Sequence, residues 1–371
     1  MPTAWFDAPS VSAGAELAGR VLGIAGRAAI DLRPSGVRVR LDSGGHAAAV
    51  TAAADELGLA TDPSTLQLLS GVIESPQPAG LRSFWRRVTG YAPSARGLKD
   101  PLCRGPAIHL RADDGARRPL RNRIHLDVVR PGAEVERADL GAGGGPYGVL
   151  HTDADGNEVD LVPGGPLGQT DWHAVFSAMG CYRTTSRSQQ RSLASAAARI
   201  ADDAGFPLLI DLRPGLVILD SGKDMWEAHG LDLDFAELAA SVQAEARRLG
   251  ATADAALPRF VQLFLDAVDV DSLRAFWMAA LGYVADEREG VTDIYDPRRV
   301  GPVLVFQPID TTDAERLAQR NRVLVELRVP ADLAGGRVGA VLAAGGSVLE
   351  GGDGRWRLAD PDSNELVVIA G

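Results

Sequence analysis

The sequence repeats itself, and this internal duplication restricts the possible folds more than any other feature. The pentapeptide IDLRP at residues 30–34 recurs at 210–214, and both copies lead into an apolar stretch that ends in Leu-Asp-Ser-Gly. Further matches follow in the same order: Leu-Arg-x-Phe-Trp at 81–85 and 273–277, Arg-Asn-Arg at 121–123 and 320–322, and Asn-Glu at 157–158 and 364–365. Because matched segments of this kind fold alike, we expect each half to contain the same elements in the same order.

Each half begins with a smaller predicted α/β unit. In the second half it has a helix over 191–204, strands over 208–212 and 216–219, and a helix that opens at the capping sequence D-x-x-E starting with Asp234. The first half repeats this pattern between about residue 13 and residue 59.

The larger predicted units follow, and each begins with a strand, over 66–74 and over 260–267, in which Gln67 and Gln262 are matched. In the next helices apolar residues recur at i, i+3, i+4 and i+7, which predicts core positions for Phe84, Trp85, Phe276 and Trp277, with Gly90 and Gly282 ending the helices. Later strands are predicted over 107–112, 121–130, 158–162, 303–308, 322–329 and 365–369, and a helix over 331–344. This order predicts an α+β fold with β-α-β-β-β modules.

Composition and charge exclude several classes of protein. The chain has 371 residues and a net charge of −11, which argues against binding nucleic acid or an anionic membrane through a broad basic surface. Two cysteines exclude a disulfide framework and a four-cysteine zinc site. The N-terminal stretch has no basic residue before Arg20, unlike a secretory signal, and no apolar run is long enough to span a membrane. We therefore expect a cytoplasmic protein, a monomer or homodimer, whose partner is a small molecule.

The motifs of the larger units carry a resemblance to a known family. The Phe-Trp helix that ends in Thr-Gly-Tyr or Leu-Gly-Tyr, the strand Asn-Arg-x-His-x-Asp and the closing Asn-Glu strand resemble the vicinal oxygen chelate superfamily, in its glyoxalase-like and bleomycin-resistance-like branch. The resemblance covers 65–163 and 259–371. It implies paired βαβββ modules that curl into a cup, whose inner strand faces supply metal ligands and the substrate surface. Whether the cups pair within one chain or between chains stays open.

The smaller segments, 10–64 and 186–258, resemble degenerate pterin-4a-carbinolamine dehydratase domains, and 164–185 is predicted to be a linker. The family's catalytic His-His-Pro positions are held here by Gly-Arg-Ala at 26–28 and by Phe-Pro-Leu at 206–208. Neither set can transfer protons near pH 7, so dehydratase activity is not expected.

By resemblance, the ligand positions of a chelate cup fall on the first and last strand of each module. The resemblance places them at Gln67, Arg111, His125 and Glu158 in the first copy and at Gln262, Gln307, Leu324 and Glu365 in the second. We therefore expect one divalent ion (Zn, Fe, Mn or Ni) at Gln67, His125 and Glu158, since imidazole, carboxylate and carboxamide groups bind such ions.

Two departures from the family pattern affect these expectations. Arg111 stays protonated and cannot coordinate, although His109 lies on the same strand face and could substitute. No metal is expected in the second copy, where Leu324 replaces the imidazole. On the closing strand of the first copy, Glu158 and Asp160 share one face because side chains alternate.

The sequence leaves three functions open. The first is a metal-dependent lyase, isomerase or dioxygenase, with His125, Asp127 and Glu158 as catalytic candidates. The second is a resistance-like protein that binds a drug or metabolite without catalysis. The third is a metal-free acid/base enzyme of specialised metabolism. The expected substrate contacts are His109, Arg111, Gln262, Gln307 and Glu365. A structural role for His125, hydrogen-bonded in a core, is also open.

Overall fold

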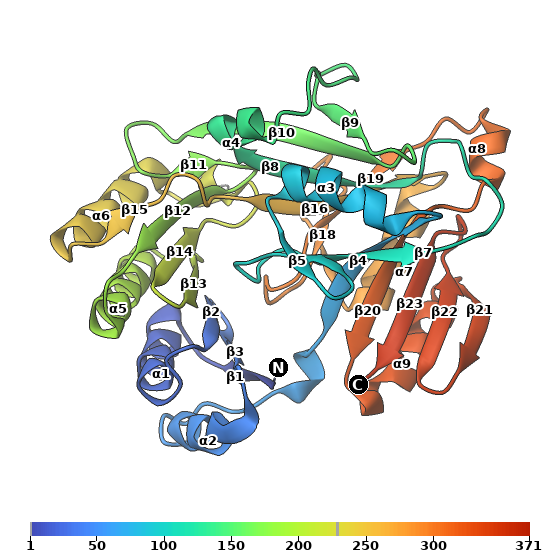
Figure 1. Cartoon of the computed structure of the whole chain (residues 1–371). Helices are drawn as coiled ribbons and strands as arrows, with labels where there is room; N and C mark the ends of the chain where they lie inside the picture. The colour runs from blue at the N-terminus through green and yellow to red at the C-terminus, as the bar shows by residue number, and fades with distance from the viewer. Residues whose placement is uncertain (1, 228–229) are drawn as a thin grey trace. The chain divides into compact units, whose positions relative to one another are not determined.

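The structure of the protein, a computed structural model, describes residues 2–227 and 230–371 and divides into two compact units. Unit 1 consists of Met1–Leu66, Val129–Glu134 and Pro163–Phe260, and unit 2 consists of Gln67–Val128, Val135–Val162 and Val261–Gly371. Both units combine helices with sheets, which agrees with the predicted α+β class (Figure 1). No helix within the described ranges is both long enough and apolar enough to cross a membrane.

Unit 1 contains one sheet whose apolar face shares a core with four helices. The strands in order of pairing are β1 (Thr3–Asp7), β3 (Gly36–Arg40), β2 (Ala29–Arg33), β13 (Leu209–Arg213), β14 (Leu216–Asp220), β12 (Ala178–Arg183), β11 (His173–Ala174) and the end of β10 (Glu158–Pro166), with β15 (Thr252–Ala253) beside β12. The helices are α1 (Val11–Ile24), α2 (Ala47–Asp55), α5 (Arg187–Asp203) and α6 (Phe235–Arg248). Alternation along β2 turns Ile30 and Leu32 toward this core, where Leu17 and Val21 of α1 meet them.

Side-chain caps fix where the helices of unit 1 begin. The Asp234 carboxylate accepts a hydrogen bond from the backbone N–H of Ala236, so α6 begins where the capping sequence predicts. Helix α5 begins at Arg187, earlier than the predicted residue 191, because the Ser186 hydroxyl accepts a hydrogen bond from the N–H of Gln189. The stretch 164–185, predicted to be a linker, contributes β11 and β12 to the sheet of unit 1.

The repeated IDLRP segments lie side by side in unit 1. Strands β2 and β13 pair antiparallel with Asp31 opposite Asp211. Arg33 donates to Asp211 at 2.7 Å, and Arg213 donates to Asp31 at 2.6 Å, so the two copies exchange buried ion pairs. Removing one partner of such a pair would leave an uncompensated buried charge.

Unit 2 contains two sheets. Sheet I has the order β10, β8 (Ile124–Pro131), β16 (Phe260–Ala267), β19 (Leu304–Pro308), β18 (Ile294–Tyr295) and β17 (Val284–Ala285), with β9 (Leu150–Thr152) beside β10. Sheet II has the order β21 (Ser347–Gly352), β22 (Arg355–Ala359), β23 (Glu365–Ala370), β20 (Val323–Val329), β4 (Leu68–Ser75), β7 (Ala107–Ala112), β6 (Gly97–Lys99) and β5 (Ala92–Ser94). The helices are α3 (Pro78–Thr89), α4 (Gly132–Ala138), α7 (Val270–Leu281), α8 (Ala314–Ala318) and α9 (Ala331–Ala343).

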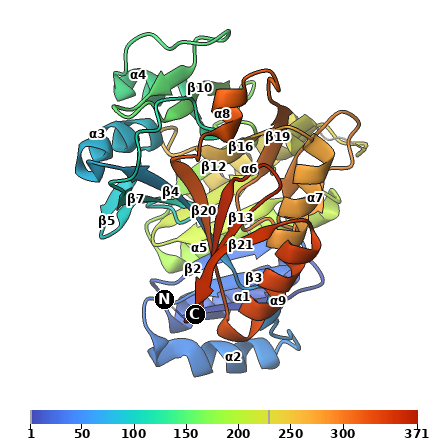
Figure 2. The same cartoon turned by 90° about the vertical axis from the view of Figure 1, so that its right-hand side faces the viewer.

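Each sheet of unit 2 combines strands from both halves of the chain. In sheet II, β4 from the first half pairs antiparallel with β20 from the second, and Figures 1 and 2 show the blue and orange strands side by side. In sheet I, β8 from the first half neighbours β16 from the second. The modules of segments 65–163 and 259–371 therefore pair with each other within one chain.

The predicted core aromatics lie in the core of unit 2. Trp85, Phe276 and Trp277 are fully buried, and Phe84 packs against the same cluster. The indole N–H groups of Trp85 and Trp277 donate to Asp153 and Asp360, which satisfies these buried donors. Gly90 and Gly282 adopt the left-handed conformation at the ends of α3 and α7, as predicted for helix stops.

Candidate metal centre

The repeated Arg-Asn-Arg motif joins the strands that carry the site. The Asn122 side-chain oxygen accepts from the backbone N–H of Arg322 at 2.8 Å, and the Asn321 oxygen accepts from the N–H of Arg123 at 2.9 Å. Their amide groups donate to Asn157 and Asn364, the asparagines of the Asn-Glu motifs. These buried bonds fix the starts of β8 and β20 against the starts of β10 and β23, so this part of the motif is structural.

Alternation along the strands of sheet I separates a core face from a second face. The apolar residues Ile124, Leu126, Val159, Leu161, Val261, Leu263 and Leu265 belong to the main core of unit 2. The residues between them point the other way. We call this second face the site face of sheet I; it consists of His125 and Asp127 on β8, Glu158 and Asp160 on β10, Gln262, Phe264 and Asp266 on β16, and Gln307 on β19.

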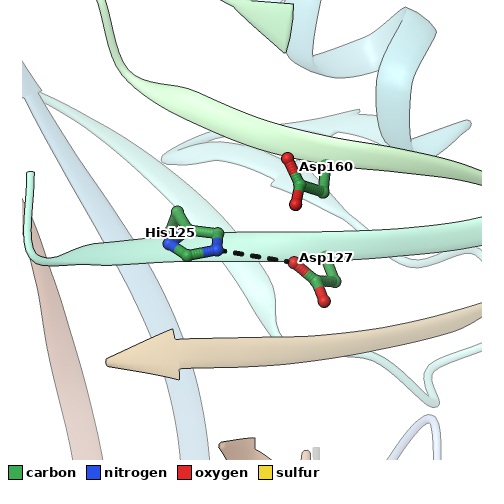
Figure 3. A group of neighbouring side chains, drawn as sticks. All are labelled: His125, Asp127 and Asp160. Carbon is green, nitrogen blue, oxygen red and sulfur yellow. Dashed lines mark ion pairs between the residues drawn. The ribbon is translucent and has the colours of Figure 1, made fainter. Parts of the chain in front are cut away.

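Three side chains converge on the site face. His125, Asp127 and Asp160 each place a possible ligand atom within 4.8 Å of the other two. Figure 3 shows the imidazole and the Asp127 carboxylate on β8, with the Asp160 carboxylate pointing toward them from β10. His125 Nε2 lies 3.6 Å from Asp127 Oδ1, and the side chains of His125 and Asp127 are only 5 % and 7 % exposed. One imidazole and two carboxylates form a donor set suited to a divalent ion.

Residues of β16 hold this group from the other side. The Gln262 amide donates to Asp127 Oδ2 at 3.1 Å, and the ring of Phe264 stacks on His125 with centroids 5.2 Å apart. The Gln262 Oε1 and His125 Nδ1 atoms are buried, and neither has a hydrogen-bond partner among the described residues. The carboxamide oxygen of Gln262 is therefore available as a further ligand.

Charge is distributed unevenly over the site face. Arg121 binds Glu158, and Arg316 of α8 binds Asp266. Asp160, by contrast, has no cationic partner within the described part of the chain. A partly buried carboxylate of this kind is stabilised by a nearby cation.

Burial sets the protonation of the site. Burial lowers the pKa of His125 below its ordinary value, and the carboxylates of Asp266 and Asp160 offset only part of that effect. The imidazole is therefore neutral near pH 7 and keeps a lone pair for a metal. Burial raises the pKa of Glu158, while Arg121 acts in the opposite direction.

The structure brings together only part of the ligand set expected from the sequence. His125 and Asp127 lie in the cluster, but Gln67 does not, because it precedes β4 of sheet II and donates to the Leu281 carbonyl at 3.0 Å. Strands β4 and β16 are eight residues long, so Ser70, not Gln67, occupies the position of Gln262. Matching the two glutamines in sequence shifted the register by three residues.

The ligand set expected from the sequence did not include Asp160, which the structure places in the cluster. Alternation had placed Glu158 and Asp160 on one face, but it does not decide which carboxylate points at His125. The contact between Arg121 and Glu158 removes that carboxylate from the cluster. Of the expected substrate contacts, Gln262 and Gln307 lie on the site face of sheet I, where Gln307 donates to Asp266 at 2.5 Å.

The remaining expected substrate contacts belong to sheet II. Arg111 binds Glu74 on the neighbouring strand, and Glu365 is bound by Arg320 and Arg357. The His109 ring lies 3.7 Å from Glu326, a carboxylate that Arg96 binds with two hydrogen bonds of 2.9 and 2.8 Å.

Sheet II has apolar residues where sheet I has the cluster. Leu324 corresponds to His125, because it lies beside Val72 in the way that His125 lies beside Phe264. Val367 corresponds to Asp160, because it lies two residues after Glu365, as Asp160 lies two residues after Glu158. Val72, Leu324 and Val367 form a separate buried apolar cluster. Only Glu326, at the position of Asp127, remains of the three possible ligands, and Arg96 neutralises it.

Comparison with known proteins identifies a related family. The sequence profile of the family described as "Glyoxalase-like domain" matches residues 70–162 and 262–369, which is more than half of the chain. No curated protein matches the sequence significantly.

Comparison with solved structures gives matches of low overall similarity. Glyoxalase I from Zea mays is 11 % identical over 82 % of this chain and 92 % of its own, with a TM-score of 0.40. The hypothetical protein SA1046 from S. aureus is 18 % identical over 29 % of this chain and 90 % of its own, with a TM-score of 0.22. TM-scores this low do not establish a common overall fold.

Proposed function

This chain belongs to the glyoxalase-like domain family, and on that premise we propose that it acts on a small molecule with the help of a divalent metal ion held on the site face of sheet I. The observation that carries the proposal is the convergence of His125, Asp127 and Asp160 within 4.8 Å. The sequence placed the metal in a cup of the first copy alone, whereas the proposed site combines strands from both repeats.

The donor chemistry of these residues fits a first-row divalent ion. A neutral imidazole nitrogen and two carboxylates suit Mn²⁺, Fe²⁺ or Zn²⁺, and the Gln262 Oε1 atom, buried without a partner among the described residues, would supply a fourth ligand. When bound, such an ion polarises a substrate oxygen and stabilises the negative charge that develops on it.

Glu158 is the residue we assign to proton transfer. It lies on the same face of β10 as Asp160, and burial raises its pKa above that of an ordinary glutamate, which favours a carboxyl group that takes up and returns a proton. Arg121, in the segment that precedes β8, binds it and fixes its position. A lyase or isomerase reaction would use the metal ion and Glu158 together. The ion would polarise an oxygen-bearing carbon of the substrate, and Glu158 would remove a proton from the atom next to that carbon.

Metal loading of purified variants tests the proposal. After dialysis against Mn²⁺, elemental analysis is expected to find about one ion per wild-type chain and much less in His125→Ala and Asp160→Asn. Gln67→Ala is the matched control, and it should load like the wild type because Gln67 binds Leu281 elsewhere. Equal loading of His125→Ala and Gln67→Ala, with both variants folded by circular dichroism, would refute the site.

The variant Glu158→Gln tests whether Glu158 transfers a proton or binds the metal. This variant should keep its metal and lose turnover, since Glu158 lies outside the cluster. Loss of the metal together with activity would instead show that Glu158 is a ligand.

One observation favours binding without catalysis as a second candidate. Glu158 and Asp266 are both held by arginines, so the site face has little freedom for acid/base chemistry. A protein that sequesters a drug or metabolite would bind its ligand tightly and release it unchanged. Product analysis by mass spectrometry after long incubation with bound candidate molecules distinguishes the two functions.

We also propose that unit 1 derives from a pair of pterin-dehydratase-like segments that no longer catalyse. The antiparallel pairing of the two IDLRP strands and their exchanged ion pairs support a duplicated origin for these segments. An assay with a carbinolamine pterin substrate should show no turnover, and measurable turnover would contradict this proposal.

A further inference from the structure

We propose that unit 1 carries a second binding site, a pocket between α1 and α5 that takes a small molecule with two acidic groups. The pocket has a volume of about 430 Å³, within the usual range for small-molecule sites of roughly 300–1,000 Å³. Its walls include Ser12, Glu16, Arg20, Arg191, Ser195 and Arg199. Every one of these residues belongs to unit 1, so the site does not depend on the proposed metal centre.

The two helices run in opposite directions along the pocket. Asp202 at the end of α5 accepts hydrogen bonds from the backbone N–H groups of Val11 and Ser12 at the start of α1. Toward the other end of α1, the aliphatic part of the Arg191 side chain packs against Gly19. A Cβ atom added to Gly19 would lie only 2.8 Å from Cδ of Arg191, so a glycine is needed at this contact. Figure 1 shows α1 and α5 as neighbours. The pocket therefore has Arg199 near one end and Arg191 near the other.

The spacing of the α5 residues defines the shape of the ligand. Arg191, Ser195 and Arg199 follow each other at intervals of four and lie on one face of α5. Eight residues of an α-helix advance about 12 Å, so the two guanidinium groups can bind acidic groups at opposite ends of an extended molecule.

The two pocket arginines of α5 form no ion pair. Both Arg191 and Arg199 are exposed, and within the described ranges neither contacts a carboxylate, although Arg199 lies close enough to Glu245 to help lower the pKa of that carboxyl. The nearby acids are already engaged, because Glu16 binds Arg20 and Glu245 accepts two hydrogen bonds from Arg248. Arg20 is itself held by Glu56 at 2.7 Å.

This charge arrangement selects anions. In a chain with a net charge of −11, two unpaired guanidinium groups beside one pocket form a local positive site. Guanidinium groups bind phosphate and carboxylate with paired hydrogen bonds, and the Ser12 and Ser195 hydroxyls add donors in the same pocket. The N–H groups at the start of α1 are capped by Asp202, so the arginines and not the helix end supply the recognition.

Calorimetric titration of the full chain at constant ionic strength tests the proposal. The probes are tripolyphosphate and sebacate, which carry acidic groups at both ends, and inorganic phosphate and decanoate, which carry one. We expect saturable binding of tripolyphosphate, sebacate or both, and at least tenfold weaker binding of the single-headed probes. The comparison between the two double-headed probes shows whether phosphate or carboxylate is preferred.

Variants at the two ends of the pocket locate the binding. Arg191→Ala and Arg199→Ala should each weaken the binding of the double-headed probe about tenfold or more, which is the loss of roughly one charge-assisted contact. Arg247→Ala removes the same charge from the neighbouring helix α6, where Arg247 pairs with Asp171, and should leave the affinity unchanged. Absence of saturable binding, or an equal loss in Arg247→Ala, would overturn the proposal, provided that thermal unfolding shows all three variants folded.

Discussion

At the scale of single residues, His125 depends on two different neighbours. Phe264 covers one side of its ring, and the carboxylates of Asp127 and Asp160 face its edge. The aromatic contact restricts the orientation of the imidazole, and burial keeps it neutral. Metal affinity at this site should therefore respond to residues that bind no metal themselves.

Replacing Phe264 tests this dependence. Phe264→Leu removes the stacked ring while keeping an apolar side chain, and we expect the affinity for Mn²⁺ to fall by about 10–100-fold, as for other residues that orient a ligand. Phe84→Leu, at a partly buried ring on α3 of the same unit, is the matched control. Titration calorimetry measures both, and equal affinities in the two variants would show that Phe264 only fills space.

Asp31 makes unit 1 sensitive to acid. Burial by itself would raise the pKa of Asp31, but Arg213, Arg38, Arg40 and Arg33 outweigh it and hold the pKa well below its ordinary value. A carboxylate with a lowered folded-state pKa stabilises the fold above its unfolded pKa of about 3.9, and this stability is lost as the pH falls through the lower folded value.

Asp31→Asn should therefore be costly at neutral pH. The substitution removes the negative charge that compensates Arg213 and Arg38, so their positive charges remain buried without a partner at this position. We therefore expect the free energy of unfolding of unit 1 to fall by about 3–5 kcal/mol at pH 7. The difference from the wild type should begin to shrink below pH 4, because Asp31 of the unfolded chain then takes up a proton while the folded carboxylate stays ionised down to its lower pKa. Denaturant unfolding at pH 7 and at pH 3 measures this, and a difference independent of pH would contradict the assignment.

At the scale of elements, strand register decides which residues form the site. The sequence predicted the strands at 66–74 and 260–267 nearly correctly, and it predicted the alternation that puts Glu158 and Asp160 on one face of their strand. Alignment of β4 with β16 was wrong by three residues, because both strands begin with two apolar residues and the glutamines offered a false match. A period of two identifies faces but gives no absolute register.

Sheet II offers a gain-of-function test of this register. The triple variant Arg96→Ala, Leu324→His, Val367→Asp places imidazole and carboxylate groups beside Glu326, at the positions of the sheet I cluster. Without metal the buried polar groups should lower the melting temperature markedly, and Zn²⁺ should restore much of the loss. Adding Glu326→Gln removes the third ligand and should abolish the response to Zn²⁺. An equal response with and without Glu326 would show that the two sheets are not equivalent.

At the scale of the whole molecule, both units are built from both halves of the chain. Strands β2 and β13 meet in unit 1, and β4 meets β20 in unit 2. The sequence could predict that the halves repeat, but not which modules pair, because matched modules have the same apolar faces and either pairing buries them equally well. The family match confirms two glyoxalase-like segments, whereas the dehydratase resemblance and the cytoplasmic location stay predictions.

Separated halves should therefore fail to fold. A fragment of residues 1–185 contains β2 and β4 without their partners β13 and β20, and a fragment of residues 186–371 has the complementary deficit. We expect neither to unfold cooperatively, and we expect an equimolar mixture to recover the circular dichroism of the intact chain. Cooperative unfolding of either fragment alone would contradict the pairing of modules across the repeats.

The position of a bound metal tests the central claim most directly. Crystals of the full chain soaked in Mn²⁺ or Zn²⁺ should show one anomalous peak in unit 2, at about 2.0–2.2 Å from His125 Nε2 and from oxygens of Asp127 and Asp160. A peak bound by Glu158 without Asp160, or no peak in unit 2 at saturating metal, would contradict the account.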